Sequence, residues 1–129
     1  MKWIEVGLLA VGAIVGALLR YKLVESPIAI YGLPINVLAI NIIGSFILGV
    51  FSVISVGLNF APQYTLLVAV GFCGSFTTMS SFALETSNLL DSNRFSLLAL
   101  NIFANVGLSL GALLGGRLLG DVFLERIVR

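Results

Sequence analysis

The middle of the chain, residues 71–85, gathers hydroxyl side chains within a segment that is otherwise apolar. It reads GFCGSFTTMSSFALE and ends on the carboxylate of Glu85. Hydroxyl groups cost free energy in hydrocarbon unless they find hydrogen-bond partners or line a path that holds water. Gly74 and Ser75 also mark a point where a helix can break, and a break at membrane depth is tolerated only against protein or a cavity. These residues therefore predict the lining of a site for an ion or a small polar substrate.

The composition points to a membrane protein. Of 129 residues, 59% are hydrophobic and only 10% are charged, and residues 26–84 contain no Asp, Glu, Lys or Arg. Such a chain is far from the average of soluble domains and predicts an all-α integral membrane protein with one domain over residues 1–129. With no His and a single Cys, we expect neither a cluster of soft metal ligands nor an enzyme. A net charge of +1 without a basic block gives no reason to expect a nucleic-acid partner.

Four segments are long enough to cross hydrocarbon about 30 Å thick, which takes ~20 helical residues. We predict them over residues 4–23, 37–58, 64–90 and 95–119, with the third broken by the hydroxyl-rich stretch. Short turns rich in Pro, Gly, Asn and Asp separate them, and residues 121–129 are expected to form a short charged tail. The chain is thus predicted to be a multi-pass protein of a cell membrane.

Both termini lie on one side of the bilayer if all four segments cross it. The basic residues then divide almost equally, with Lys2, Arg117, Arg126 and Arg129 on one side and Arg20, Lys22 and Arg94 on the other. The positive-inside rule gives such a chain no preferred orientation. Either small loops simply carry few charges, or the protein inserts both ways and pairs head-to-tail. Four short helices enclose little space alone, so an oligomer is expected.

Small and polar residues recur at helical spacing. Glycines four residues apart allow helices to approach closely, and we predict packing roles for Gly12, Gly16, Gly107, Gly111 and Gly115. Polar residues four apart share one helix face, as Asn41 does with Ser45 and Asn105 does with Asn101 and Ser109. Gly107 lies about 200° around the helix from Asn105, so one face is expected to pack and the other to present donors. We interpret Asn101 as a tie between helices, and Asn41, Asn105 and Ser109 as pore lining.

The groups offered to a ligand inside the membrane are mostly neutral. They are amides, hydroxyls and aromatic ring edges, joined by the single carboxylate of Glu85. Neutral donors can replace the water around an anion without trapping it by a full opposite charge. A ring edge carries partial positive charge and can also face an anion. A small anion that accepts strong hydrogen bonds therefore fits better than a bulky cation.

Motifs along the chain resemble those of the Fluc (CrcB-type) fluoride channels: GALLR at residues 16–20, INIIGS at residues 40–45 and the central stretch. The likeness covers essentially the whole chain, because its length, its four spans and the order of its motifs also agree. It implies a passive fluoride-selective channel through which a microbe loses fluoride. The implied assembly is an antiparallel dual-topology dimer with two pores and a central Na⁺, held by the backbone carbonyls of Gly74 and Thr77.

By this resemblance, residues of the second, third and fourth segments line the fluoride pore: Asn41, Ser80, Ser81, Phe82 and Ser109. Asn41 would donate to fluoride, and Phe82 would present a ring edge to it. Arg20 matches an arginine of the vestibule, where its charge would attract anions from water. Glu85 matches an acid just beyond the hydroxyls and is a candidate for gating or coupling, although these residues do not specify its role.

Two pore positions depart from the family pattern. Met79 stands where a phenylalanine is usual, and Asn105 stands where an aromatic residue or His is common. A thioether has nothing to donate and cannot imitate a positive ring edge. Met79 can fill space in a working homodimer, impair the pore, or be complemented by a paralogous chain in a heterodimer.

Two other functions are compatible with four short spans. One is a non-conducting accessory subunit, whose polar residues serve only assembly. The other is a small multidrug-type exporter, which needs a carboxylate in the middle of its first span. Glu5 lies near the entrance of the first segment and Glu85 toward the end of the third, so neither takes that position.

Overall fold

Four helical passages run through the chain, each long and apolar enough to cross a membrane, as the sequence predicts. In the computed structural model, which describes residues 2–128, they are α1 (Trp3–Val24), α2 (Asn36–Gly57), a composite third passage (Pro62–Asp91) and α6 (Phe95–Val128). Many large apolar side chains on these helices are exposed. Such a surface suits surroundings of lipid, in which only helices or closed barrels satisfy the backbone.

The third passage consists of several helical pieces. α3 (Pro62–Thr65) begins with a proline, whose missing N–H costs little in a first turn. The π-helix η1 (Leu66–Cys73), the short α4 (Gly74–Phe76) and then α5 (Met79–Asp91) follow. Between α4 and α5, Thr77 and Thr78 have extended backbone, with ψ of 159° and 114°. Gly74 itself is helical, so the extended residues lie beyond the point that the sequence suggested.

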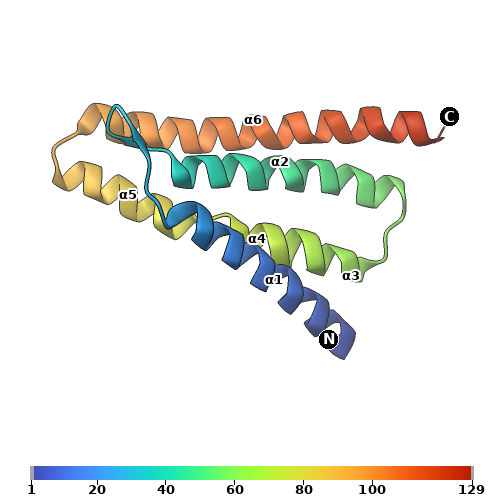
Figure 1. Cartoon of the computed structure of the whole chain (residues 1–129). Helices are drawn as coiled ribbons and strands as arrows, with labels where there is room; N and C mark the ends of the chain where they lie inside the picture. The colour runs from blue at the N-terminus through green and yellow to red at the C-terminus, as the bar shows by residue number, and fades with distance from the viewer. Residues whose placement is uncertain (1, 129) are drawn as a thin grey trace.

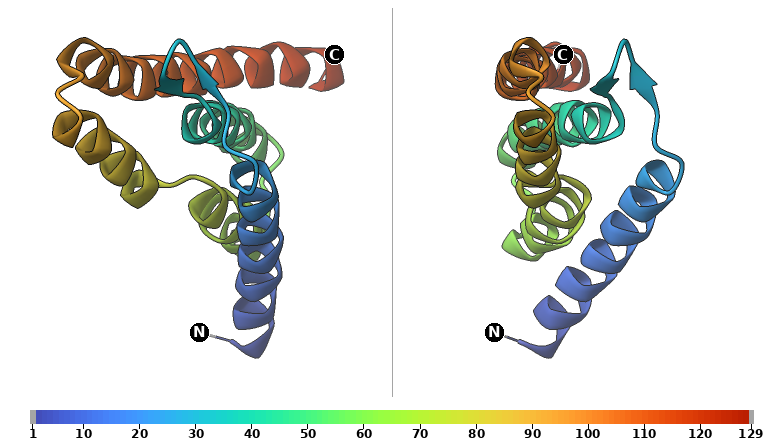
Figure 2. Two further views of the ribbon diagram at one scale, coloured as in Figure 1. Left: turned by 60° about the vertical axis from the view of Figure 1, so that its left-hand side comes forward. Right: turned by 90° about the vertical axis from the view of Figure 1, so that its left-hand side faces the viewer.

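The helices pack mainly as two pairs. α2 lies against α6, whereas α1 lies across η1 and α4 and splays away from α6 (Figures 1 and 2). A Cβ added to Gly12 or Gly16 would meet backbone atoms of η1, which confirms their packing role. Gly49 of α2 and Gly116 of α6 allow a similarly close approach of these two helices, because a Cβ on either glycine would meet the backbone of the facing helix.

The glycines at 107, 111 and 115 do not take part in this contact. Within the described part of the chain, and apart from the neighbouring backbone of α6 itself, no atom lies within 4 Å of a Cβ placed at any of them. Their predicted packing role is therefore wrong for contacts inside one chain. Asn101 and Asn105 lie on the buried face of α6 instead.

The end of α6 also differs from the prediction. The helix does not stop near residue 119 but continues to Val128, so residues 121–128 are helical rather than a tail; Arg129 lies outside the described residues. The reason is packing, since Gly120 lies against Val53 and Leu124 lies against Gly57 of α2. At 34 residues, α6 is about 51 Å long and exceeds the hydrocarbon thickness of about 30 Å.

Turn residues with positive φ connect the passages. Gly32 takes a φ of 87° in the hairpin of β1 (Ala29–Ile30) and β2 (Leu33–Pro34). Asn59 and Asn93 take φ of 51° and 56° at the ends of α2 and α5, a region that Asn tolerates better than most residues. The hairpin therefore folds back beside the start of α2, as Figure 1 shows.

Candidate intramembrane site

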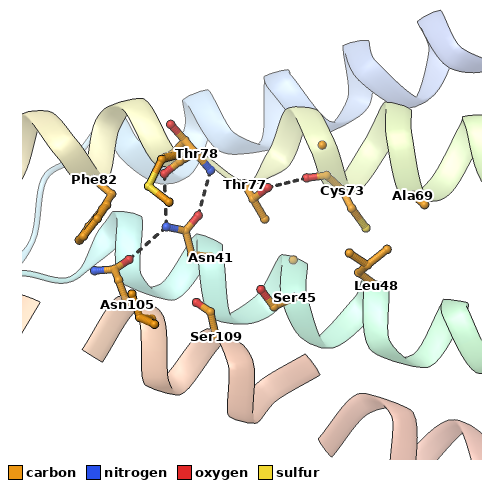
Figure 3. A pocket seen from close by; sticks show the side chains of 14 residues that line it. Asn41, Ser45, Leu48, Ala69, Cys73, Thr77, Thr78, Phe82, Asn105 and Ser109 are labelled. Carbon is orange, nitrogen blue, oxygen red and sulfur yellow. Dashed lines mark hydrogen bonds between the residues drawn. The ribbon is translucent and has the colours of Figure 1, made fainter. Parts of the chain in front are cut away.

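A cavity of about 420 Å³ lies beside the extended residues of the third passage. α2, α6 and both halves of the third passage form its wall (Figure 3). Among the described residues, no Asp, Glu, Lys or Arg lines it, and its polar lining consists of Asn41, Ser45, Thr77, Thr78, Asn105 and Ser109. Of the other predicted site residues, Gly74, Met79 and Phe82 also line this cavity, whereas Arg20, Ser80, Ser81 and Glu85 do not.

The extended backbone at Thr78 turns its peptide groups toward α2. The Thr78 N–H donates to Asn41 Oδ1 at 2.9 Å, and Asn41 Nδ2 donates to the Thr78 carbonyl at 3.3 Å (Figure 3). In a continuous α-helix the Thr78 N–H would bond to the carbonyl of Gly74. The amide of Asn41 therefore replaces the helical partner of Thr78. Sequence analysis gave Thr78 no role of its own, although a Thr directly before a helix is a known N-cap signal.

A chain of side-chain hydrogen bonds runs from Asn41 into the bundle. Asn41 Nδ2 donates to Asn105 Oδ1 at 3.0 Å, and Asn105 Nδ2 donates to Asn101 Oδ1 at 3.0 Å. Asn101 Nδ2 donates to Thr86 Oγ1 at 3.1 Å, and the Thr86 hydroxyl donates to the Phe82 carbonyl at 2.7 Å. Because every donor points the same way, each amide fixes the orientation of the next. We call the series Asn41, Asn105, Asn101 and Thr86 the amide relay.

Asn101 takes a structural place in this relay. Its exposed fraction is 0%, and it does not line the cavity. It connects α6 to α5 through Thr86, in agreement with its interpretation as a tie between helices. Asn105 both lines the cavity and links Asn41 to Asn101, so it belongs to the site and to its support.

Hydroxyl groups cluster at the start of α5. Thr78 Oγ1 caps the helix by accepting from the Ser81 N–H at 3.1 Å. The hydroxyls of Ser80 and Ser81 lie 3.3 Å and 3.1 Å from the same oxygen. On the opposite wall, Ser109 Oγ is buried and finds no hydrogen-bond partner within residues 2–128. Its hydroxyl is available to a ligand or to water in the cavity.

Two backbone carbonyls lose their helical partners at this point. The Thr78 N–H, which would bond to Gly74 O in a continuous helix, donates to Asn41, and the Ser81 N–H, which would bond to Thr77 O, donates to Thr78 Oγ1. Arg20 Nη1 approaches Thr77 O at 3.4 Å. Carbonyl oxygens freed in this way suit a hard cation such as Na⁺.

Glu85 lies apart from the cavity. With Gly32, Asn88, Ser92 and Arg94 it lines a smaller cavity of about 240 Å³ near the hairpin. Its Oε2 is buried and has no partner among residues 2–128. The carboxylate and the amides of the larger cavity are therefore separate features of the fold.

The fold and the cavity define a class of protein: a membrane protein of several passages that holds a neutral, polar site among its spanning helices. Residues 7–117 match the family model described as "CrcB-like protein, Camphor Resistance (CrcB)". The chain belongs to this family, and the resemblance seen in its motifs is confirmed.

The names of similar proteins agree with this family assignment. The chain is 57% identical over 117 residues to the "Fluoride-specific ion channel FluC" of Nitrosopumilus maritimus, which covers 91% of this chain and 93% of that protein. It is 43% identical over 109 residues to the protein of the same name from Koribacter versatilis, covering 82% and 86%. With the protein of that name from Methanococcus aeolicus it shares 38% over 102 residues, covering 79% and 83%. All three are named as ion channels and not as enzymes.

Proposed function

We propose that this chain forms a passive, fluoride-selective ion channel in the cell membrane. The observation that carries the proposal is the cavity beside Thr77 and Thr78, whose described lining offers amides and hydroxyls but no charged side chain. The names of the relatives point to the same ligand. A channel of this kind conducts an ion down its gradient and catalyses no reaction.

Asn41 is the donor on which fluoride recognition depends. One of its N–H groups donates to Asn105 Oδ1 at 3.0 Å, and the other donates to the Thr78 carbonyl at 3.3 Å. The second bond is the longer one, and an anion can take the place of that carbonyl because charged acceptors form hydrogen bonds about twice as strong. Ser109 adds a hydroxyl that has no other partner within the described residues.

The remaining pore residues continue the path on either side of Asn41. Ser80 and Ser81 supply hydroxyls at the start of α5, and Phe82 turns a ring edge toward the anion. Met79 fills space in the cavity wall. Arg20 raises the anion concentration at the vestibule, and Glu85 lies beyond the hydroxyls as an acid that can influence entry.

The channel is an antiparallel homodimer of dual topology. Met79 supports this assembly, because it lines the cavity and yet is 73% exposed in the single chain. A second copy would cover it and close the cavity into a pore. The nearly equal numbers of basic residues on the two sides permit insertion in both orientations.

We further propose a structural Na⁺ at the centre of this dimer. The freed carbonyls of Gly74 and Thr77 would hold it, since carbonyl oxygens are ligands that hard cations prefer. The ion would supply a fixed positive charge between the two subunits. In the single chain Arg20 donates weakly toward Thr77 O, and Na⁺ would take over this contact.

Flux from liposomes tests the function. Purified protein is reconstituted into vesicles loaded with potassium fluoride or with chloride. When an ionophore dissipates the membrane potential, an electrode should record the release of fluoride, whereas the vesicles loaded with chloride should retain chloride. Asn41→Leu should abolish fluoride release without changing the elution volume of the folded protein. A folded dimer that releases no fluoride would refute the homomeric channel. Release that appears only after co-expression with a paralogous chain would replace it with a heterodimer.

A further inference from the structure

Arg117 of α6 lies farther inside the helix bundle than its position near the C-terminus suggests. Gly49 of α2 packs against Leu113 of α6, and a Cβ at Gly49 would lie 3.2 Å from the backbone nitrogen of Arg117. Gly57, the last residue of α2, faces Leu124. Gly49 precedes Gly57 by two helical turns, about 12 Å along the axis. The backbone of Arg117 therefore lies about 12 Å inside the end of a span that carries no charge.

Arg117 faces a cleft rather than the packed side of α6. A space of about 730 Å³ opens between α2 and α6, and Ser52, Arg117 and Asp121 are its polar lining. Among residues 2–128, Arg117 is not paired with a carboxylate. Leu48 lines both this cleft and the larger cavity, so the cleft begins where the cavity ends. An arginine at this depth must face water or a counter-charge.

We propose that this cleft is a water-filled anion mouth, in which Arg117 concentrates small inorganic anions before they reach the cavity. Ser52 Oγ donates to the carbonyl of Gly49 at 2.7 Å, so its lone pairs remain free for the water that fills the cleft. Asp121, one turn further out, opposes anions and moderates the attraction. The proposal rests on the proposed channel function and adds an entry site at the end of the bundle away from Arg20.

Antiparallel pairing makes the two mouths equivalent. In such a dimer, the end of one copy that carries Arg20 meets the end of the other copy that carries Arg117. Each side of the membrane would then present both arginines to the entering anion. Clefts lined by charges of one sign raise the local concentration of counter-ions about tenfold or more, and Asp121 lowers that factor here.

The cleft can be probed without measuring fluoride. In a Cys73→Ala background, which removes the one native thiol, Ser52→Cys is modified with a negatively charged and with a positively charged methanethiosulfonate, and the two rates are compared. We expect the negative reagent to react faster, Arg117→Gln to lower the ratio of the two rates about tenfold, and Asp121→Asn to raise it. Arg126→Gln, on the same helix but beyond the end of α2, is the matched control and should leave the ratio unchanged.

Several outcomes decide the proposal. If the thiol introduced by Ser52→Cys reacts with neither reagent, the cleft is dry, and if Arg117→Gln leaves the ratio unaffected, the arginine does not act on anions; either result overturns the proposal. In vesicles, Arg117→Gln should lower fluoride efflux about tenfold at limiting fluoride and little at saturating fluoride. If the ratio changes as expected but no variant conducts fluoride, the anion mouth stands and the channel function fails.

Discussion

The amide relay makes Thr86→Val an informative change, because valine keeps the shape of threonine and removes only the hydroxyl. Thr86 holds one end of the relay by accepting from Asn101 Nδ2 at 3.1 Å, while its own proton is used on the Phe82 carbonyl. The Thr78 N–H holds the other end by donating to Asn41 Oδ1 at 2.9 Å. With both ends present, the amides of Asn41, Asn105 and Asn101 have a single set of orientations in which every hydrogen bond of the relay forms.

The cost of losing one end follows from burial. Asn101 has an exposed fraction of 0%, so its Nδ2 would remain unpaired in the variant. An unsatisfied buried donor costs about 1–3 kcal/mol. If the Asn101 amide rotates by 180° to avoid this cost, its amino group faces the amino group of Asn105. Asn105 must then rotate as well, which places its amino group against that of Asn41. The preference for presenting the Asn41 amino group should therefore weaken about 5- to 150-fold.

The assay is fluoride and chloride efflux from liposomes, with Thr86→Ser as the matched variant. We expect Thr86→Val to slow fluoride efflux by about tenfold and to lower the preference for fluoride over chloride, because a misdirected Asn41 presents its carbonyl oxygen to the anion. Thr86→Ser keeps the hydroxyl and should behave like the unmodified protein. Elution volume and thermal unfolding identify a variant that has simply failed to fold.

The reasoning is wrong if Thr86→Val folds, unfolds at the same temperature as Thr86→Ser and conducts fluoride with the same rate and selectivity. That result would mean that Asn41 keeps its orientation through Thr78 alone. An unfolding temperature that falls with no change in selectivity would assign the relay to stability only. Both results can be told apart from loss of the channel, since the unmodified protein is measured beside the variants.

Further predictions concern packing, the cavity wall and the cation. Gly116→Ala should destabilise the protein by about 1–3 kcal/mol in thermal unfolding, because its Cβ would meet the backbone of α2, whereas the neighbouring Gly115→Ala faces open space and should be neutral. Met79→Phe should leave fluoride efflux unchanged if Met79 only fills space; a faster or slower rate would contradict that role. Replacing Na⁺ by N-methylglucamine should lower the unfolding temperature of the dimer reversibly, and no change would argue against a cation at the carbonyls of Gly74 and Thr77.

The four passages were predictable because a spanning helix needs only length and apolar composition. The end of α6 was not predictable in this way. Residues 121–128 contain charged side chains typical of a tail, yet Gly120 and Leu124 hold this part against α2. The glycine motifs of α6 were misleading for a similar reason. Glycines four residues apart indicate that a close approach is possible, but α6 contains two such series, Gly107, Gly111 and Gly115 in one and Gly116 and Gly120 in the other. Only the second series faces α2.

Individual polar residues of the site could be chosen from the sequence, but their arrangement could not. Asn41 and Asn105 meet only because the register of α2 against α6 brings their amides to 3.0 Å. Thr86 joins them through a third helix and was overlooked, since one threonine in an apolar span carries no distinguishing pattern. Arg117 was counted only as a charge near the C-terminus, because its depth depends on where α2 ends beside it.

The extended pair Thr77 and Thr78 couples the two kinds of ion site that we propose. A single departure from helical geometry sends the Thr78 N–H to Asn41 and the Ser81 N–H to Thr78 Oγ1. The first bond orients the proposed anion donor, and both bonds release carbonyls from their helical partners. Restoring a continuous helix here would pair these carbonyls again and would release Asn41 at the same time. Changes that straighten the third passage should therefore remove anion selectivity and cation dependence together, while changes to Ser109 should affect the anion alone.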